Sequence, residues 1–405
     1  MIEAKPALLD GIRVLDLSAV IMGPYAGQIL GDLGADVIKI EPPSGDSTRY
    51  TGPHRTAGMA SLFLGVNRNK RSVALDLKEH AARNALLRLV DNADILIHSM
   101  RPQKLAGLGI CPAELRIRNP GLIFAGLYGF GEGGTYAGRP AYDDIIQGMA
   151  GFADLSTRQD EEPRYFPTIV ADKASGLFAV NAILAALVQR ERTGRGAEIE
   201  VPMYEAMVAF NLVEHMYARH FDIDRGDLGY PRVLASWRRP YRSRDGYMCV
   251  MPYTNAHWRA FFNEAGVPEC SQDPRFIDIG ARTRHIDALY EILGAAIAQR
   301  TSAEWLEACD RLAIPAAPVA SLAEIVDDPH LRSVGFFETV HDPALGDLAF
   351  PGVPYRFDGA RPGISRPPLL GEHTRQVLAE AGIDPQTITA LADGNGAPLT
   401  AQDAI

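Results

Sequence analysis

The chain has 405 residues, of which 47% are hydrophobic, and a formal net charge of -10 at pH 7. This length exceeds the size at which a single hydrophobic core stops growing, so the sequence predicts two structural units. The acidic balance argues against general nucleic-acid binding, although basic pockets can still form locally.

The first 130 residues alternate short strand-like runs with helical patterns. Such alternation is typical of a parallel sheet covered by helices on both faces, which predicts an α/β fold with a Rossmann-like sheet. The first run leads through SAVIMGPYAG into a helix with Pro24 near its start and Gly34 at its end. This is not the GxGxxG dinucleotide fingerprint, so a nicotinamide enzyme is disfavoured. The strand-like runs are 12–17, 37–40, 73–77, 95–98 and 122–127.

A single carboxylate, Asp172, lies between a short apolar run at 166–170 and a long alanine-rich helical pattern over 173–190. The run is too short and too β-branched for a helix, so Asp172 is expected at the helix N-terminus. A carboxylate in that position can be a plain N-cap. It can also be a reactive group whose charged form the helix dipole favours by about 0.3–1 kcal/mol.

The rest of the chain predicts a smaller α+β unit. A helix over 204–219 leads into a Gly- and Asp-rich linker, and a hairpin over 238–252 turns at Arg244-Asp245-Gly246. Helices are expected over 257–265, 283–300 and 302–312, followed by a second crossing at 315–318. From about residue 345 the sequence shows little periodicity, apart from a short helix over 373–381.

The four cysteines show no CxxC pairing, which disfavours a zinc site or a disulfide framework, and we expect no metal and ordinary buried thiols. The N-terminal MIEAKPALLDG lacks a basic start followed by an apolar stretch, and no apolar run reaches roughly 18 residues. We therefore expect a cytoplasmic protein without a membrane partner.

Seven motifs in order resemble the class III CoA-transferases, the family of formyl-CoA transferase and carnitine-related CoA-transferases, with α-methylacyl-CoA racemase as a sister branch. They begin with LDGIRVLDLSAVIMGPYAGQILGDLGADVIKIEPPSGD from Leu9 and NRNKRSVALDLK from Asn67. LYGFGEGGTYAGRPAYDDIIQGMAGF, TGRGAEIEVPMYEAM, RRPYRSRDGYMCVMPY, PAAPVASLAEIVDDPHLRSVGFF and PPLLGEHT follow. The resemblance spans nearly the whole chain.

The resemblance implies that Asp172 is a covalent nucleophile. A carboxylate that attacks an acyl-CoA thioester forms a mixed anhydride and releases CoA thiolate, so thioester energy is retained. The thiolate can then form an aspartyl-CoA thioester, from which an incoming carboxylic acid accepts the CoA. Coenzyme A is thus the carrier, and acyl-CoA and a carboxylic acid are the substrates.

The resemblance also implies a CoA site. The phosphate groups of CoA are bound by basic side chains and backbone N–H groups. Formyl-CoA transferase has Gln, Arg and Arg where this chain has Ile21, Pro42 and Gly107, so its acyl specificity is not transferred. The implied CoA contacts are Ala19, Val20, Leu75, Lys78, Ser99, Met100, Arg101, Lys104, Arg139, Tyr142 and Asp143.

The family's architecture implies a homodimer of two interlocked rings, with a large domain built from both chain ends. We assign 1–203 to the large domain, 204–230 to a linker helix, 231–318 to the small domain and 319–405 to the return into the large domain. Oxyanions formed during transfer need donors, and the turn containing Gly129, Gly131, Gly133 and Gly134 offers backbone N–H groups, unless it is a plain surface loop.

Two other classes of function stay open at this point. The racemase branch uses a His-Asp proton relay, but Tyr142 stands where that branch has its histidine, and a phenol ordinarily holds its proton at neutral pH. Intramolecular CoA transfer within one substrate is a further alternative. A CoA-binding protein without catalysis would need Asp172 to be only a cap.

Four arginines of the predicted hairpin suggest how an acid could be selected. One of Arg238, Arg239, Arg242 and Arg244 could bind a second carboxylate bidentately and favour dicarboxylic acyl groups, unless all four point to solvent. An unchanged preference between mono- and dicarboxylic acids in Arg239→Met would exclude that role for Arg239.

Overall fold

The computed structural model describes residues 7–393. These residues form two compact units. Among the described residues, the large unit comprises 7–150, 167–208 and 330–393, so it draws on both halves of the chain, and the second unit comprises Gly151–Phe166 and Ala209–Pro329. Segment 151–166, which the sequence analysis assigned to the large domain, thus groups with the second unit.

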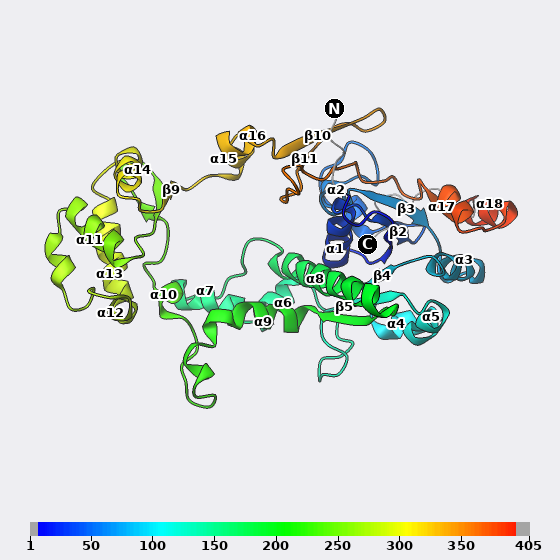
Figure 1. Cartoon of the computed structure of the whole chain (residues 1–405), viewed down its shortest axis with the longest axis horizontal. Helices are drawn as coiled ribbons and strands as arrows, with labels where there is room; N and C mark the ends of the chain where they lie inside the picture. The colour runs from blue at the N-terminus through cyan, green and yellow to red at the C-terminus, as the bar shows by residue number, and fades with distance from the viewer. Residues whose placement is uncertain (1–6, 394–405) are drawn as a thin grey trace. The chain divides into compact units, whose positions relative to one another are not determined.

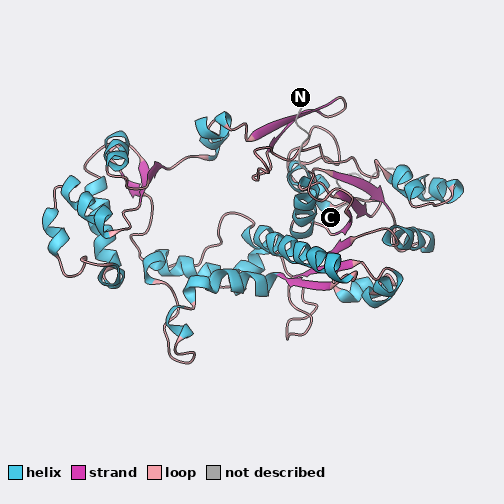
Figure 2. Ribbon diagram, in the orientation of Figure 1, coloured by secondary structure: helices cyan, strands magenta, loops and turns pink. Residues whose placement is uncertain are grey.

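The large unit is built on a six-stranded sheet in the order β3-β2-β1-β4-β5-β6, with every neighbouring pair parallel. Strands β2 to β5 of this sheet are labelled in Figure 1, and strands are drawn in magenta in Figure 2. Five strands are found where the sequence predicted them, except that β3 begins and ends three residues before the predicted run at 73–77. The sixth was missed because its sequence EIEVP carries two glutamates and reads as part of a polar segment. The strands are β1 Arg13–Leu17, β2 Asp36–Glu41, β3 Lys70–Ala74, β4 Ile95–His98, β5 Ile123–Tyr128 and β6 Glu198–Pro202.

The strand order reverses direction at β1. From β1 the chain builds outward through β2 and β3, and then returns to add β4 on the opposite side. The connections that leave the carboxyl ends of β1 and β4 therefore run in opposite directions along the sheet. Such a reversal opens a crevice beyond the strand ends, which is the usual ligand site of open parallel sheets.

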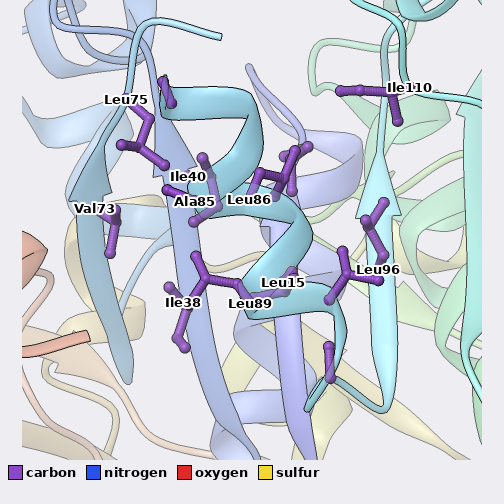
Figure 3. Packing of buried hydrophobic residues seen from close by; sticks show 14 of the residues in the cluster. Leu15, Ile38, Ile40, Val73, Leu75, Ala85, Leu86, Leu89, Leu96 and Ile110 are labelled. Carbon is purple, nitrogen blue, oxygen red and sulfur yellow. The ribbon is translucent and has the colours of Figure 1, made fainter. Parts of the chain in front are cut away.

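One face of the sheet is covered by α3, α5, α17 and α18. Leu15, Ile38 and Leu96 from three strands pack against Leu86 and Leu89 of α3 (Figure 3). The helices of the large unit are α1 Met22–Asp32, α2 Ser61–Val66, α3 His80–Val90, α4 Pro102–Gly107, α5 Pro112–Arg118, α6 Asp143–Met149, α8 Val170–Thr193, α17 Thr374–Glu380, α18 Pro385–Asp393 and the 3-10 helix η1 Ser47–Tyr50.

Helices α1 and α8 cover the other face and pack closely on each other. A Cβ at Gly176 of α8 would lie 3.0 Å from the carbonyl oxygen of Met22, so only glycine allows this approach. Within residues 7–393, α8 is a helix that by its length and composition alone could cross a membrane. Half of that stretch is buried against the protein, as in a core helix.

The C-terminal part of the large unit adds an antiparallel hairpin, β10 Phe337–Asp342 and β11 Gly346–Pro351. Leu348 and Phe350 of this hairpin pack on Phe63 of α2. The sequence analysis missed the hairpin and α18, which lie beside or within the Pro- and Gly-rich sequence after residue 345. The predicted helix over 373–381 is confirmed as α17.

The second unit has its own core, in which Trp258, Phe261 and Trp305 lie among aliphatic residues of α13. The predicted hairpin is confirmed as β7–β8, and β9 extends it to three strands. The elements are α7 Phe152–Asp160, η2 Tyr217–His220, α10 Pro231–Leu234, β7 Tyr241–Arg242, β8 Tyr247–Val250, α11 Asn255–Glu264, η3 Pro268–Gln272, α12 Ile279–Arg284, α13 Ile286–Ile297, α14 Ser302–Arg311, β9 Ala316–Pro318 and α15 Leu322–Val326. Helices α9 Met203–His215 and α16 Pro329–Ser333 contain residues of both units.

Candidate active site

A cavity of about 540 Å³ opens at the carboxyl ends of β1 to β5, and every residue that lines it belongs to the large unit. Its walls come from the connections that follow these strands. All the predicted site residues except Asp143 line this cavity, although they come from segments up to about 150 residues apart in sequence. They are Ala19, Val20, Leu75, Lys78, Ser99, Met100, Arg101, Lys104, Arg139, Tyr142 and Asp172.

Asp172 is the third residue of α8 and lies within the first turn of the helix, whose N-cap is Ile169. Its side chain is 8% exposed, and its Oδ1 accepts a hydrogen bond of 3.1 Å from the backbone N–H of Met22 at the start of α1. The close packing of α1 on α8 is what brings this N–H to the carboxylate.

The pKa of Asp172 is raised from an ordinary 3.8 to about 6. Burial is the largest cause, the negative charge of Asp143 adds to it, and the hydrogen bond from Met22 opposes both. The sequence analysis expected the helix dipole to favour the charged form, but burial and the neighbouring carboxylate outweigh it. Asp172 is therefore an unusually basic carboxylate that is still mostly ionised at pH 7 and above.

Asp143 was predicted to contact CoA, but it does not line the cavity. It is buried, and its Oδ1 accepts hydrogen bonds from the backbone N–H groups of Ala171 at 2.7 Å and Asp172 at 3.2 Å. Gln147 donates to its other oxygen at 2.6 Å. The structure thus shows Asp143 holding the first turn of α8, and its contact with CoA stays a prediction.

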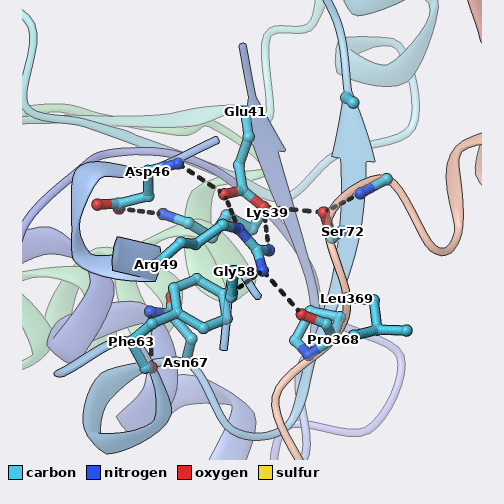
Figure 4. Close-up of polar contacts among 12 residues, drawn as sticks. Lys39, Glu41, Asp46, Arg49, Gly58, Phe63, Asn67, Ser72, Pro368 and Leu369 are labelled. Atoms are coloured by element: carbon cyan, nitrogen blue, oxygen red, sulfur yellow. Dashed lines mark hydrogen bonds and ion pairs between the residues drawn. The ribbon is translucent and has the colours of Figure 1, made fainter. Parts of the chain in front are cut away.

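Three other carboxylates line the cavity, and each has a structural partner. Glu41 receives two hydrogen bonds from Arg49 at 2.8 and 2.7 Å, and Asp46 receives one from Lys39 at 2.9 Å (Figure 4). Burial raises the pKa of Glu41 and of Asp46, but these cationic partners outweigh it and hold both pKa values below their ordinary range. Asp76 accepts the backbone N–H of Lys78 at 3.0 Å.

The fully buried side chain of Lys39 holds the connection between β1 and α1 in place. Its Nζ donates to the carbonyl of Ser18 and to Asp46, both at 2.9 Å. Asp46 accepts in turn from the N–H of Val20, a residue with φ of +70°, which is rare for a β-branched side chain. Ser99 Oγ accepts the N–H of Ala19 at 3.0 Å. This network holds the wall of the cavity that precedes Met22.

Four basic side chains are exposed at the cavity, namely Lys78, Arg101, Lys104 and Arg139. Within residues 7–393 none of them forms an ion pair with a carboxylate. In a protein with a net charge of -10, such a group of unpaired cations at one cavity favours a polyanionic ligand. Phosphate and pyrophosphate groups match it chemically.

The glycine-rich turn after β5 was expected to offer its backbone N–H groups to oxyanions, but two of these groups already have acceptors within the protein. The N–H of Gly131 donates to Glu205 at 3.1 Å, and that of Glu132 donates to Glu200 at 2.6 Å. Of the four glycines, Gly129 lines the cavity. The carboxylates of Glu200 and Glu205 thus use donors that the sequence analysis assigned to oxyanions.

Sequence reasoning missed three contributors to the site, namely Lys39, Asp46 and the backbone of Met22. The pairing of a lysine on β2 with the aspartate of the following PPSGD turn was visible as opposite charges seven residues apart. The burial of both side chains was not visible in the sequence, because charged residues are ordinarily exposed.

No group of three or more metal-ligating side chains is assembled within the described ranges. The prediction of four buried thiols is partly wrong, since Cys309 is buried and Cys249 is exposed.

The chain matches CoA-transferase family III over residues 9–374. It is a family III CoA-transferase. Among curated proteins, it is 33% identical to a succinate–glutarate CoA-transferase of Agrobacterium fabrum, covering 96% of this chain and 99% of that protein. It is 34% identical to an acetyl-CoA:oxalate CoA-transferase of Acetobacter aceti, covering 94% and 99%. A crystal structure of a mutant of Rv3272 from Mycobacterium tuberculosis is similar with a TM-score of 0.81 at 31% identity, covering 93% and 100%.

The electrostatics of this transferase predict an acid limb in its pH profile. Because Asp172 has a pKa of about 6, a reaction that needs its anion should show kcat/KM falling about tenfold per pH unit below that value. Asp143→Asn removes a negative charge that raises this pKa, so the limb should move to lower pH in kcat/KM measured from pH 4.5 to 8.5. Asp144→Asn, a change at an exposed neighbour, is the control. A limb that stays in place in Asp143→Asn contradicts the assignment.

Proposed function

We propose that this CoA-transferase works through Asp172, which forms a mixed anhydride with the acyl group and then an aspartyl-CoA thioester. The observation that carries the proposal is that Asp172 differs from the other carboxylates at the cavity. Glu41 and Asp46 are neutralised by buried cations, whereas burial and a like charge leave Asp172 with a pKa of about 6. A more basic carboxylate is the better nucleophile, and at pH 7 it needs no general base.

The proposed reaction balances over four steps. An oxygen of Asp172 attacks the thioester carbonyl, the C–S bond breaks, and CoA leaves as thiolate. The thiolate attacks the carbonyl carbon of Asp172, which releases the first acid as a carboxylate and leaves the aspartyl-CoA thioester. The carboxylate of the second acid attacks this thioester and again expels the thiolate. The thiolate then attacks the second acyl carbonyl, which regenerates the Asp172 carboxylate.

Each tetrahedral intermediate carries an oxyanion, and the N–H of Met22 supports the proposal as a donor beside the reacting carbon. It donates to Asp172 Oδ1 at 3.1 Å. When Asp172 is attacked by the thiolate, negative charge develops on an oxygen of this same carboxyl group. A fixed backbone N–H at that position stabilises the charge without reorganisation.

For CoA itself, the proposal places the phosphates with the unpaired cations Lys78, Arg101, Lys104 and Arg139. Ala19, Val20, Ser99 and Asp172 line the same cavity as these cations. The cavity of about 540 Å³ is of ordinary size for a ligand site.

We further propose short dicarboxylic acids as substrates on at least one side of the reaction. The two curated relatives named above act, by their names, on succinate and glutarate and on oxalate, and these three acids carry two carboxyl groups. The family resemblance also supports an interlocked homodimer and a cytoplasmic location, and light scattering on the purified protein tests the dimer.

The direct test of the function is a transfer assay. Purified protein is incubated with succinyl-CoA or acetyl-CoA and a panel of free acids, and the acyl-CoA products are separated by chromatography. New acyl-CoA from glutarate, oxalate or another short dicarboxylate, with matching loss of the donor, supports the proposal. Hydrolysis alone, or transfer confined to long monocarboxylic acids, contradicts it.

A further inference from the structure

Among the described residues, four arginines are buried, and they fall into two contrasting pairs. Arg49 is 1% exposed and forms two hydrogen bonds with Glu41, and Arg68 is 6% exposed and forms two with Asp32. Arg232 and Arg282 are equally buried, at 4% and 1% exposed, but neither has a carboxylate within 4.0 Å in residues 7–393. The second pair of arginines therefore lacks the carboxylate partner that each arginine of the first pair has.

Arg232 and Arg282 lie on α10 and α12, which contact each other in the second unit. Arg282 is held by two acceptors, the carbonyl of Phe276 at 2.9 Å and Oδ1 of Asn255 at 2.6 Å, while its Nε–H has no acceptor. Arg232 donates weakly to the hydroxyl of Tyr290 at 3.5 Å, and its Nη1 has no acceptor. Each guanidinium thus presents a buried donor without a partner.

The two side chains also repel each other. Burial lowers the pKa of Arg282, and the positive charge of Arg232 lowers it further, while Asp278 opposes them from outside ion-pair range. The Asp278 carboxylate is used at the start of α12, where its Oδ1 accepts the N–H of Ala281 at 2.7 Å. A guanidinium does not lose its proton at neutral pH, so the two charges persist unless an anion neutralises them. Buried charges without partners are costly in free energy.

We propose that Arg232 and Arg282 form a binding site for the carboxylate of a small organic acid. Guanidinium N–H groups match the two oxygens of a carboxylate, and carboxylic acids are what this class of enzyme handles. The ring of Tyr253, 5.4 Å from the Arg232 guanidinium, is half exposed and marks where the pair approaches the surface. The inference goes beyond the reaction on Asp172, since it uses neither that residue nor the CoA cavity.

We propose this buried pair as the carboxylate site in place of the four arginines of the predicted hairpin. Arg238, Arg239, Arg242 and Arg244 are all exposed. Arg239 lies over the ring of Trp237 at 4.6 Å, and Arg244 donates to the carbonyl of Gln299. Surface arginines of this kind are solvated without a ligand, whereas the buried pair is not.

The test is calorimetric titration of succinate into the Asp172→Asn variant, which cannot turn over, with saturating CoA in a buffer free of other carboxylates, sulfate and phosphate. Arg232→Met should weaken succinate binding by about tenfold or more, because charge-assisted hydrogen bonds are lost. Arg275→Met is the control, since Arg275 is exposed and paired with Asp273 at 2.7 Å. Equal affinity in Arg232→Met and the control would overturn the proposal.

A second measurement separates a binding role from a structural one. In the same buffer without succinate, Arg232→Met should melt at the same temperature as the parent or higher, because it relieves an unpaired buried charge. A clear fall in the melting temperature would mean that Arg232 has a structural role, and would overturn the proposal. So would phosphate binding more tightly than succinate, because the pair would then not select a carboxylate.

Discussion

Replacing Asp172 by asparagine should lower the rate of CoA transfer by at least about 10⁴-fold, as expected when a covalent nucleophile is removed. An amide cannot form the anhydride, while its oxygen can still accept the hydrogen bond from Met22. The measurement is the steady-state rate of acyl-CoA exchange at pH 8, where the parent carboxylate is ionised. Asp76→Asn, which alters another carboxylate at the same cavity, should keep most of the activity.

The same substitution should stabilise the protein. The pKa of Asp172 rises from an ordinary 3.8 to about 6 on folding, which corresponds to a destabilisation of about 3 kcal/mol at pH values above both. Well below pH 3.8 the carboxyl is neutral in both states, so the penalty is absent there. It is small at pH 4 and grows as the pH rises towards 6. Asp172→Asn should therefore unfold at higher denaturant concentration at pH 8, with little difference from the parent at pH 4.

Two results would contradict this account of Asp172. One is transfer activity within tenfold of the parent in Asp172→Asn. The other is a loss of stability at pH 8, which would mean that the carboxylate serves the fold as a cap.

Replacing Lys39 by methionine should destabilise the large unit by about 3–5 kcal/mol, the typical result when one partner of a buried ion pair is removed. Both Lys39 and Asp46 have side chains that are essentially inaccessible to solvent, and their charged atoms lie 2.9 Å apart. Without the ammonium group, Asp46 is left as an uncompensated buried charge, and the carbonyl of Ser18 loses its donor. Chemical denaturation monitored by circular dichroism measures the effect.

The second partner provides the control. In the double variant Lys39→Met/Asp46→Asn no unpaired charge is buried, so it should recover part of the stability lost in Lys39→Met. Transfer activity should stay reduced in both variants, since the loop of Ala19 and Val20 loses its support. A change of less than about 1 kcal/mol in Lys39→Met would show that this ion pair does not hold the cavity wall.

The central sheet could be predicted from the sequence because its strands are buried on both faces and read as continuous apolar runs. The runs ILI of β4 and IFAGLY of β5 are of this kind, whereas β2 and β3 also carry charged residues. β6 could not be read in this way, since residues of EIEVP are partly exposed at the sheet edge. The β10–β11 hairpin depends on its contact with Phe63, nearly 300 residues away in sequence, which no local pattern reveals.

The sequence predicted well which residues line the cavity. It predicted less well what those residues do there. Asp172 was recognised, but its pKa depends on Asp143 and on burial, and both follow from packing. Asp143 itself was placed among ligand contacts, whereas its hydrogen bonds hold α8. Arg232 and Arg282 were overlooked because charged residues in a sequence are read as exposed, and their burial is decided by the tertiary structure.

The most direct test of the central claim is to trap the activated carboxyl group of Asp172. The protein is incubated briefly with a panel of short acyl-CoAs, hydroxylamine is added, and the digested peptides are analysed by mass spectrometry. The account predicts a hydroxamate on the peptide that carries Asp172, formed with those acyl-CoAs that serve as donors and absent from Asp172→Asn. An unmodified peptide, together with deuterium uptake at the α-carbon of an α-methylacyl-CoA, would contradict it and indicate proton transfer instead of CoA transfer.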